Sequence, residues 1–578
     1  MQSSPRTINV VGAINPVRAL LIGAMGTTCD PVVVVEHRKP QPYTPSPWGD
    51  FFLSHQPCTP SQLLSMKERA RVKEEEVKQI VRDTFASSSD MALKLELVDT
   101  LQRIGVGYHY GEEIDDLLRA VHRDVQALHQ EGGCDDDGLY VTSLRFYLLR
   151  KHGYRVSSDV FVKFKDEQGN FASTDDVSCF LMLYDAAHLR TRGEEILDSA
   201  IAFTKIRLQS VMDSLEPELA REVQCTLETP RYRRVERVEA RRYISVYERK
   251  AAPSRNDTIL EFAKLDYNIL QALYCEELKA LTIWWKDLRS RADLRFARER
   301  VVEMYFWMLG VVHEPQYSYS RILLTKFFKL VSLIDDFCDS YSTTEESEEF
   351  TMAIEKLALT LILETACAMH KKLTIILTHL HLLLQIDGRW NEEVAEQIPA
   401  HMKALYINIL DNINDIIHEL KLGENSHAEL AKELLIDIAQ CYHAEVKWRD
   451  EHYVPAKVEE HLQLSAPSSA CMHITNLTFI SLGDVTTRED IQWVSSYPKI
   501  IRGVCTIARI SNDIMSHERE QASKHVVSTV QTCMKEYGFA PEQAKGKLGM
   551  LIDEAWMDIV KGCLDGKQPM HGIVGKGG

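Results

Sequence analysis

Apolar residues recur at every third or fourth position along almost all of the chain from about residue 60 onward. This spacing gathers them on one face of a helix, whereas a half-buried strand needs strict alternation, and no alternating pattern persists. Prolines and glycines interrupt the pattern at helix-sized intervals, as at Gly132-Gly133, Pro217 and Pro315. A repeat of fixed period is not evident, which disfavours a solenoid. The sequence therefore predicts an all-α fold.

A chain of 578 residues is long enough for two or more domains, each with its own core. The helical pattern breaks over residues 251–256, and this break is the expected domain boundary. We expect a disordered leader over residues 1–36, an N-terminal helical domain over 37–256 and a C-terminal domain over 257–578. Because the leader lacks the layout of a secretory signal, we expect a cytoplasmic protein, with plastid import as the alternative.

The charge balance narrows the range of partners. The chain carries 67 basic and 84 acidic residues, a formal net charge of −17, whereas broad nucleic-acid binding needs a basic face. Its 13 cysteines include no C-x-x-C pair, which indicates reduced thiols. We expect no nucleic-acid partner, although a local basic pocket for a small anion is compatible with this composition.

An acidic cluster, D-D-x-x-D, is formed by Asp335, Asp336 and Asp339. On a helix, Asp335 and Asp339 lie one turn apart on the same face, where two carboxylates repel each other unless a cation lies between them. Carboxylate and water oxygens suit Mg²⁺. The apolar residues before the cluster favour a position inside a cavity. In so acidic a chain, acidic residues also occur at these positions by chance. The alternative interpretation is a run of charged residues exposed to solvent.

A second polar cluster contains Asn512, Ser516 and Glu520, four residues apart. On a helix these three side chains form one stripe over two turns. Amide, hydroxyl and carboxylate oxygens are again ligands for Mg²⁺. The largely apolar run 500–510 precedes them and suggests an inward-facing site, with an ordinary polar helix face as the alternative.

Three arginines and one tryptophan lie close to these clusters in the sequence. Arg298 and Arg300 precede the first cluster, and Arg509 lies about one turn before the second. Guanidinium groups bind diphosphate through bidentate hydrogen bonds, although any one of them could form an ordinary surface salt bridge. The indole face of Trp307 can stabilise a carbocation, although a lone tryptophan is more often part of a core.

Taken together, the four elements follow one another in an order that resembles the class I terpene synthases of plants. Residues Arg38 to Trp48 resemble the family's R-R-x8-W element, in which Lys39 replaces the second arginine. The resemblance covers about residues 36 to 571 with one interruption. Further stretches similar to the family lie at 38–48, 144–161, 314–318 and 447–448.

The resemblance implies a C-terminal domain with the class I terpenoid synthase fold and an N-terminal α-barrel that is a relic of class II cyclases. The D-x-D-D acid of class II cyclases does not occur in the N-terminal half, so cyclisation started by protonation is not expected. The implied reaction is the ionisation of a prenyl diphosphate, followed by cyclisation or rearrangement of the carbocation. Farnesyl diphosphate is favoured over geranyl diphosphate. The implied enzyme is a monomeric carbon–oxygen lyase without a membrane span.

The resemblance also assigns roles to the candidate residues. Three Mg²⁺ ions, with Mn²⁺ as an alternative, would be held by Asp335, Asp339, Asn512, Ser516 and Glu520. The expected substrate-binding groups are Arg298, Asp335, Asp339, Arg509 and Asn512. Asp336 would assist the metal ligands, the arginines Arg298, Arg300 and Arg509 would retain the released diphosphate, and Trp307 would stabilise the cation.

Residues around the expected pocket are implied in the same way. Thr475, Asn476 and Leu477 would line the pocket, and the segment 38–48 would fold over its mouth as a lid.

Residues 357–389 interrupt the resemblance. They are rich in leucine and isoleucine, but His370-Lys371-Lys372 divides them into apolar pieces too short to cross a bilayer. The favoured interpretation is a retained intron or an error in the gene model, and the alternative is a real additional helix. Transcripts that lack this segment would support the first one.

The resemblance ends near His571, whereas the family continues for a few tens of residues that close the site against water. We therefore expect low or no turnover from the chain as it stands. The alternative to an active enzyme is a silent homologue that binds Mg²⁺ and diphosphate without turnover. A chain-elongating prenyltransferase is disfavoured, because it would carry two D-D-x-x-D motifs.

Overall fold

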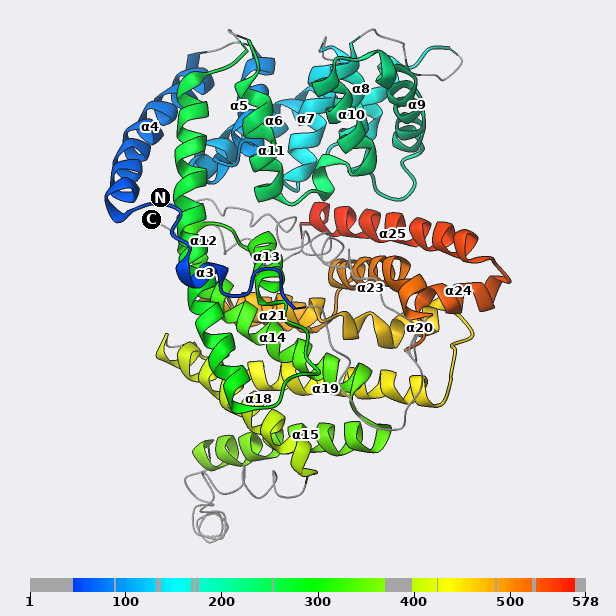
Figure 1. Cartoon of the computed structure of the whole chain (residues 1–578). Helices are drawn as coiled ribbons and strands as arrows, with labels where there is room; N and C mark the ends of the chain where they lie inside the picture. Colours follow the sequence, from blue (N-terminus) through cyan, green and yellow to red (C-terminus); the bar gives the residue numbers. More distant parts are fainter. Residues whose placement is uncertain are drawn as a thin grey trace.

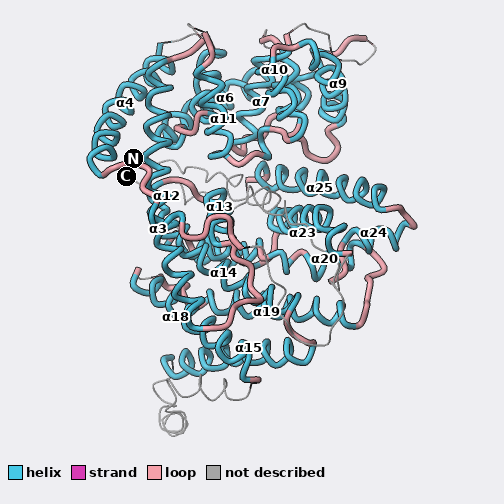
Figure 2. The backbone as a smooth tube through the Cα atoms, in the orientation of Figure 1, coloured by secondary structure: helices cyan, strands magenta, loops and turns pink. Residues whose placement is uncertain are grey.

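The computed structural model describes residues 45–87, 90–130, 137–167, 171, 176–251, 254–369, 398–423, 425–483, 486–521 and 526–566, except for the side chains of 128–130, 340 and 357–369. Helices joined by loops make up this part of the chain (Figure 2). Among the described residues, the extended pairing is limited to one isolated bridge between Lys165 and Phe171. The predicted all-α fold is thereby confirmed.

The helices form two lobes (Figure 1). The N-terminal lobe contains α4 (Pro60–Ser87), α5 (Met91–Arg103), α6 (Gly111–Gln130), α7 (Leu139–Lys151), α8 (Val177–Ala187), α9 (Glu195–Val211), α10 (Pro217–Glu228) and α11 (Glu236–Glu248). At its centre is α7, whose residues from Thr142 to Arg150 are all buried. This helix packs against α5 and α8, so the core of the lobe lies around it.

The C-terminal lobe contains the other long helices. They are α12 (Asp257–Arg291), α13 (Val301–Val311), α14 (Ser318–Ser340), α15 (Thr344–Met369), α18 (Ala400–Leu422), α19 (Leu430–Asp450), α20 (Val458–Ser465), α21 (Cys471–Ser481), α22 (Arg488–Ser495), α23 (Lys499–Glu520), α24 (Thr529–Tyr537) and α25 (Pro541–Leu564). The short helices are α3 (Phe51–Ser54) and the 3₁₀ turns η1 (Gly107–Tyr110), η2 (Ser158–Phe164), η3 (Met212–Ser214), η4 (Arg231–Arg233), η5 (Pro315–Tyr317) and η6 (Pro467–Ser469).

Helix α12 runs through both lobes and connects them (Figure 1). The side chain of Asn256 caps its start by accepting a hydrogen bond from the amide of Ile259 at 3.1 Å. In the N-terminal lobe α4 packs along it, and in the C-terminal lobe α3, α13, α14 and α18 pack against it. A helix of 35 residues in contact with both cores holds the two lobes in a fixed relation.

Helix α25 forms a second connection between the lobes. It packs on α23 in the C-terminal lobe and reaches the N-terminal lobe through ion pairs. Arg233 lies 2.8 Å from Asp553, and Arg192 lies 3.1 Å from Asp558. The rings of Tyr232 and Trp556 also meet edge to face. These contacts bury apolar surface as well as charge, so α25 is fixed from both sides.

Several expectations concern residues outside the described part: the leader 1–36, the two basic residues of the lid element, most of the inserted segment and the chain beyond residue 566. The backbone of α15 continues through Met369 and so carries the first 13 residues of the insert, 357–369, as helix, while 370–389 lie outside the description. Among the described helices, none is long and apolar enough to cross a membrane.

Candidate active site

The acidic cluster D-D-x-x-D lies near the C-terminal end of helix α14. Asp335 and Asp339 are half-buried, one turn apart, while Asp336 is fully buried between them. Burial and the neighbouring charge of Asp339 raise the pKa of Asp335 to about 7, against the opposing effect of Arg298. A raised pKa in the metal-free protein is expected for a carboxyl group that binds a cation during the reaction.

Arg298 connects the loop before α13 to this cluster. Its backbone amide donates to Asp336 at 2.9 Å, its Nη2 donates to Asp335 at 2.7 Å, and its Nε also donates to Asp336. Both oxygens of Asp336 are therefore engaged by Arg298. This geometry gives Asp336 the task of fixing the arginine loop, while Asp335 and Asp339 remain partly open to solvent.

Arg300 has a different environment. It is half-buried, and its guanidinium forms no hydrogen bond or ion pair with the described residues. Burial lowers the pKa of Arg300, and the positive charges of Arg298 and Arg519 lower it further. Because Arg298 is already bound to Asp335 and Asp336, Arg300 is the arginine of this loop that can bind an anion.

Lys329, which the sequence did not single out, lies on α14 beneath the acidic cluster. It is completely buried, its Nζ donates to the backbone carbonyl of Arg298 at 2.7 Å, and it lies 4.4 Å from the centre of the Trp285 ring. Burial lowers its pKa to about 8, with Asp336 opposing the shift. The lysine thus holds the arginine loop from below, because the carbonyl that it binds belongs to residue 298.

Glu445 on α19 is a second functional candidate that the sequence did not reveal. Its carboxylate accepts a hydrogen bond from the hydroxyl of Ser468 at 2.5 Å and lies 3.8 Å from Arg509. Burial raises its pKa to about 7, against the effect of Arg509, and the charges of Asp339 and Asp513 add to the rise. Glu445 therefore belongs to the same electrostatic cluster as Asp339.

Arg509 on α23 is clamped at the turn between α20 and α21. Its Nε donates to the carbonyl of Ser465 at 2.9 Å, and its Nη2 donates to the hydroxyl of Ser468 at 3.0 Å. Burial favours loss of its proton, but the surrounding carboxylates, Glu445 most strongly and Asp335 more weakly, hold the pKa of Arg509 above its usual value. Helices α14, α19 and α23 therefore turn charged groups toward one another.

The second polar cluster continues along α23. Ser516 and Glu520 are buried and Asn512 is exposed, while the hydroxyl of Ser516 donates to the carbonyl of Asn512 at 2.8 Å. The intervening Asp513 accepts from the amide of Thr529 at 2.7 Å and so anchors the start of α24. Asp513 therefore has a structural partner outside the stripe formed by residues 512, 516 and 520.

The described residues contain no ready cluster of three histidine, cysteine, aspartate or glutamate side chains that could hold a metal ion. The carboxylates instead lie on separate helices, in pairs or singly. An ion such as Mg²⁺ prefers six oxygen ligands, and water usually supplies several of them.

An apolar cavity of about 30 Å³ begins next to this region. Its walls include Trp307 and Phe328, whose ring centres lie 5.4 Å apart. Thr475 lines it as expected, but Asn476 and Leu477 do not. Both are buried, and Asn476 accepts a hydrogen bond from Ser495 at 3.0 Å on the side of α22. The expectation that Asn476 and Leu477 line the pocket is therefore wrong, because successive helical residues point about 100° apart.

The N-terminal lid element is described only from residue 45. The amide of Ser46 donates to Glu299 at 3.4 Å, and Asp50 pairs with Lys286 at 2.6 Å. Trp48 packs near Phe52 with ring centres 5.8 Å apart. This segment thus reaches the loop that carries both arginines, whereas Arg38 and Lys39 lie outside the described residues.

Comparisons with known proteins agree with this arrangement. Residues 47–227 match the terpene synthase N-terminal domain, and residues 286–558 match the metal binding domain of the terpene synthase family. The (E)-beta-caryophyllene synthase of Zea mays is 50% identical over 525 residues, which cover 90% of this chain and 88% of that protein. The beta-sesquiphellandrene synthase of Sorghum bicolor is 42% identical, over 91% of this chain and 87% of that protein.

A solved structure has the same fold. Isoprene synthase from grey poplar leaves (Populus x canescens), in complex with three Mg²⁺ ions and dimethylallyl-S-thiolodiphosphate, superposes with a TM-score of 0.74 at 29% identity, over 92% of this chain and 93% of that one. Both family domains, in order and over nearly the whole described chain, carry the assignment. The chain therefore belongs to the terpene synthase family, with the two-domain helical fold and the divalent-metal-binding domain of that family.

Proposed function

We propose that this protein is a magnesium-dependent class I sesquiterpene synthase that converts farnesyl diphosphate into a fifteen-carbon terpene. The observation that carries the proposal is the convergence of Asp335, Glu445 and Arg509 from three helices beside the apolar cavity of Trp307. In the reaction, the carbon–oxygen bond of the substrate breaks, the electron pair leaves with diphosphate and an allylic cation remains. Loss of a proton or capture of water ends the reaction.

The residues present fit divalent metal ions. Asp335 and Asp339 would hold an ion from α14, where burial and neighbouring carboxylates raise the pKa values of Asp335 and of the nearby Glu445 to about 7. The stripe 512, 516 and 520 would provide ligands from α23. When bound, Mg²⁺ ions neutralise the charge that grows on the leaving diphosphate. Three ions are supported by the relative that binds three, and Mn²⁺ is an alternative with the same oxygen preference.

The cationic side chains have complementary tasks. Arg300 and Arg509 bind the diphosphate and retain it after the bond breaks, which keeps a base away from the hydrocarbon until cyclisation is complete. Arg298 aligns Asp335 through its ion pair. Trp307 presents an indole to the cavity, where cation–π attraction stabilises the allylic cation.

Support for farnesyl diphosphate comes from the relatives. Caryophyllene and sesquiphellandrene, the products named for two of them, are fifteen-carbon hydrocarbons, as farnesyl diphosphate is a fifteen-carbon precursor. Identity of 50% over both domains with a named synthase does not favour the silent homologue. The test is incubation of the purified chain with geranyl, farnesyl and geranylgeranyl diphosphate, with and without Mg²⁺, followed by gas chromatography and mass spectrometry. The proposal expects a fifteen-carbon product from farnesyl diphosphate with Mg²⁺, and it fails if another substrate is preferred.

The raised carboxyl pKa values predict a pH-dependent need for magnesium. Asp335 and Glu445 hold protons up to about pH 7 in the metal-free protein, so the ion must displace protons below that pH and meets carboxylates above it. The Mg²⁺ concentration for half-maximal rate should be about tenfold higher per displaced proton at about pH 6 than at about pH 8, with most of the rise below about pH 7. The measurement is a Mg²⁺ titration of turnover at both pH values. A requirement that does not change with pH would contradict these protonation states.

The contact between Lys329 and the arginine loop predicts a positioning effect. In Lys329→Met the carbonyl of Arg298 loses its buried donor, so the loop becomes less ordered and the Michaelis constant for the substrate should rise by about tenfold. The matched control is Lys326→Met on the same helix, which removes a partly exposed pair with Glu419 and should change this constant less than about twofold. Equal effects of both substitutions would show that Lys329 does not position the loop.

A further inference from the structure

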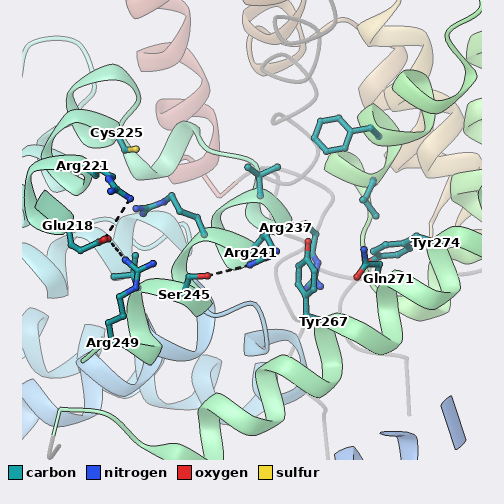
Figure 3. Close-up of a pocket in the computed structure, with 15 residues that line it drawn as sticks. Glu218, Arg221, Cys225, Arg237, Arg241, Ser245, Arg249, Tyr267, Gln271 and Tyr274 are labelled. Carbon is teal, nitrogen blue, oxygen red and sulfur yellow. Dashed lines mark hydrogen bonds and ion pairs between the residues drawn. The ribbon is translucent and has the colours of Figure 1, made fainter. Parts of the chain in front are cut away.

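A second cavity lies away from the acidic cluster. It has a volume of about 540 Å³ and opens between α10 and α11 of the N-terminal lobe and α12 and α13 of the C-terminal lobe (Figure 3). None of the metal-ligand or arginine candidates of the active site lines it. A cavity of this size at the junction of two lobes is large enough for a small-molecule ligand.

One wall of the cavity is strongly basic. The five arginines among its described lining residues are Arg221, Arg237, Arg241, Arg242 and Arg249, whereas Glu218 is the one carboxylate there. Glu218 pairs with both Arg221 and Arg249, as Figure 3 shows. Arg242 also binds Glu222 and Glu239, which lie outside the lining. Among the described residues, Arg237 and Arg241 have no hydrogen-bonded carboxylate.

Arg237 is the buried member of this wall. Only 5% of the residue is exposed, and its Nε and Nη2 are buried without a hydrogen-bond partner. Its Nη1 reaches the carbonyl of Gly105 at 3.4 Å, and the nearest carboxylate oxygen, of Asp266, is 3.9 Å away. Two unsatisfied donors on a buried cation are unfavourable unless an acceptor enters the cavity.

Arg241 lies one turn along α11 from Arg237 and extends into the cavity (Figure 3). Its guanidinium donates to the hydroxyl of Ser245 at 3.4 Å and forms no ion pair with the described residues. Because Arg237 and Arg241 share one helix face, the two guanidinium groups can bind one anionic group together.

Apolar side chains also line the cavity. Val238, which is 45% exposed, and Val246 contribute from α11, and Phe306 and Leu309 contribute from α13. Apolar side chains that share a cavity with basic ones suit a molecule with both kinds of surface. Helix α13 also carries Trp307 toward the catalytic cavity, so one helix separates the two cavities.

We propose that this interlobe cavity is an accessory binding site for an amphipathic anion, a molecule with one anionic head and one apolar chain. The head binds Arg237 and Arg241, and the chain lies on Val238, Val246 and the α13 side chains. A long-chain carboxylate and a prenyl monophosphate share this chemistry. The site is separate from the catalytic one and needs no metal ion.

The first test locates binding through a native thiol. Cys225 lines the cavity, and its alkylation can be followed by peptide mass spectrometry, with the half-buried Cys58 as the internal reference. With a chelator present, so that the metal-dependent site is inactive, laurate in one arm and farnesyl monophosphate in the other should slow the alkylation of Cys225 but not of Cys58. The arm that protects at the lower concentration identifies the source of the anion. Protection of Cys225 in neither arm overturns the proposal.

The second test changes the head-group site. Calorimetric titration of the protecting ligand should show affinity weakened by about tenfold or more in Arg241→Glu, because the charge that binds the head is reversed. The matched control is Arg123→Glu, at an exposed position of α6 that does not line the cavity. This substitution should change the affinity by less than about twofold. Wild-type affinity in Arg241→Glu would overturn the proposal. Metal-dependent turnover, measured in the same preparations, reports separately on the function proposed above.

Discussion

Asp335→Asn should lower the rate of diphosphate release from farnesyl diphosphate by about two to three orders of magnitude, with the fold intact. The substitution keeps the shape of the side chain but removes a charge that lies within the cluster of Asp339 and Glu445. Since the half-buried side chain can still accept the hydrogen bond of Arg298 as an amide, we expect the fold to persist. The measurement is steady-state release of diphosphate at saturating Mg²⁺.

The matched control for this prediction is Asp415→Asn, which makes the same change at an exposed position of α18. Its turnover should stay within about twofold of the unsubstituted enzyme. If Asp335→Asn retained most of the activity, Asp335 would not be a metal ligand. If both variants lost activity equally, the loss would come from removing any one negative charge from the protein, and not from changing the metal site.

Arg321→Met should destabilise the protein by about 3–5 kcal/mol, because it leaves the carboxylate of Glu277 buried without its cation. The two side chains meet with Nη2 and Oε1 at 2.7 Å, and Nε donates to the other carboxylate oxygen at 2.9 Å. Tyr305 donates to the same carboxylate at 2.8 Å. This completely buried pair joins α12, α13 and α14, the helices that carry the arginine loop, Trp307 and the acidic cluster.

The stability prediction is tested by the midpoint and slope of urea unfolding, followed by circular dichroism. Arg488→Met, which removes an exposed arginine from α22, is the control and should change stability by less than about 0.5 kcal/mol. Adding Glu277→Gln to Arg321→Met should recover part of the loss, since the unpaired charge is then absent. A small loss in Arg321→Met, without any recovery in the double variant, would contradict the role of the pair.

The sequence predicted the fold class because amphipathic helices require apolar residues at every third or fourth position. The buried faces of the long helices α12, α14, α19 and α23 have this spacing. It also predicted candidate ligands on α14 and α23, since side chains four residues apart share a helix face. The sequence predicted these ligands on two separate helices, but not how the two helices lie relative to each other. That Arg509 lies within the field of Asp335 could be seen only when both helices were placed.

The remaining residues had no local signal. Glu445 is one acid in an amphipathic helix, and a lysine such as Lys329 within an apolar run is indistinguishable in sequence from one whose amine reaches solvent. The roles of Asp335 and Asp336 also differ despite identical chemistry, because they are neighbours on a helix and point in different directions. The error at Asn476 has the same origin, since its neighbour Thr475 is the one that faces the cavity.

The account depends on α14 and α23 binding the same diphosphate through metal ions. The most direct measurement is a crystal structure of the protein with Mg²⁺ and a farnesyl thiolodiphosphate, which binds like the substrate and resists ionisation. We predict one diphosphate group between the helices, with metal ions joining it to Asp335 and Asp339 on one side and to Asn512, Ser516 and Glu520 on the other. Metal ions bound to one helix alone, or a diphosphate bound elsewhere, would contradict the account.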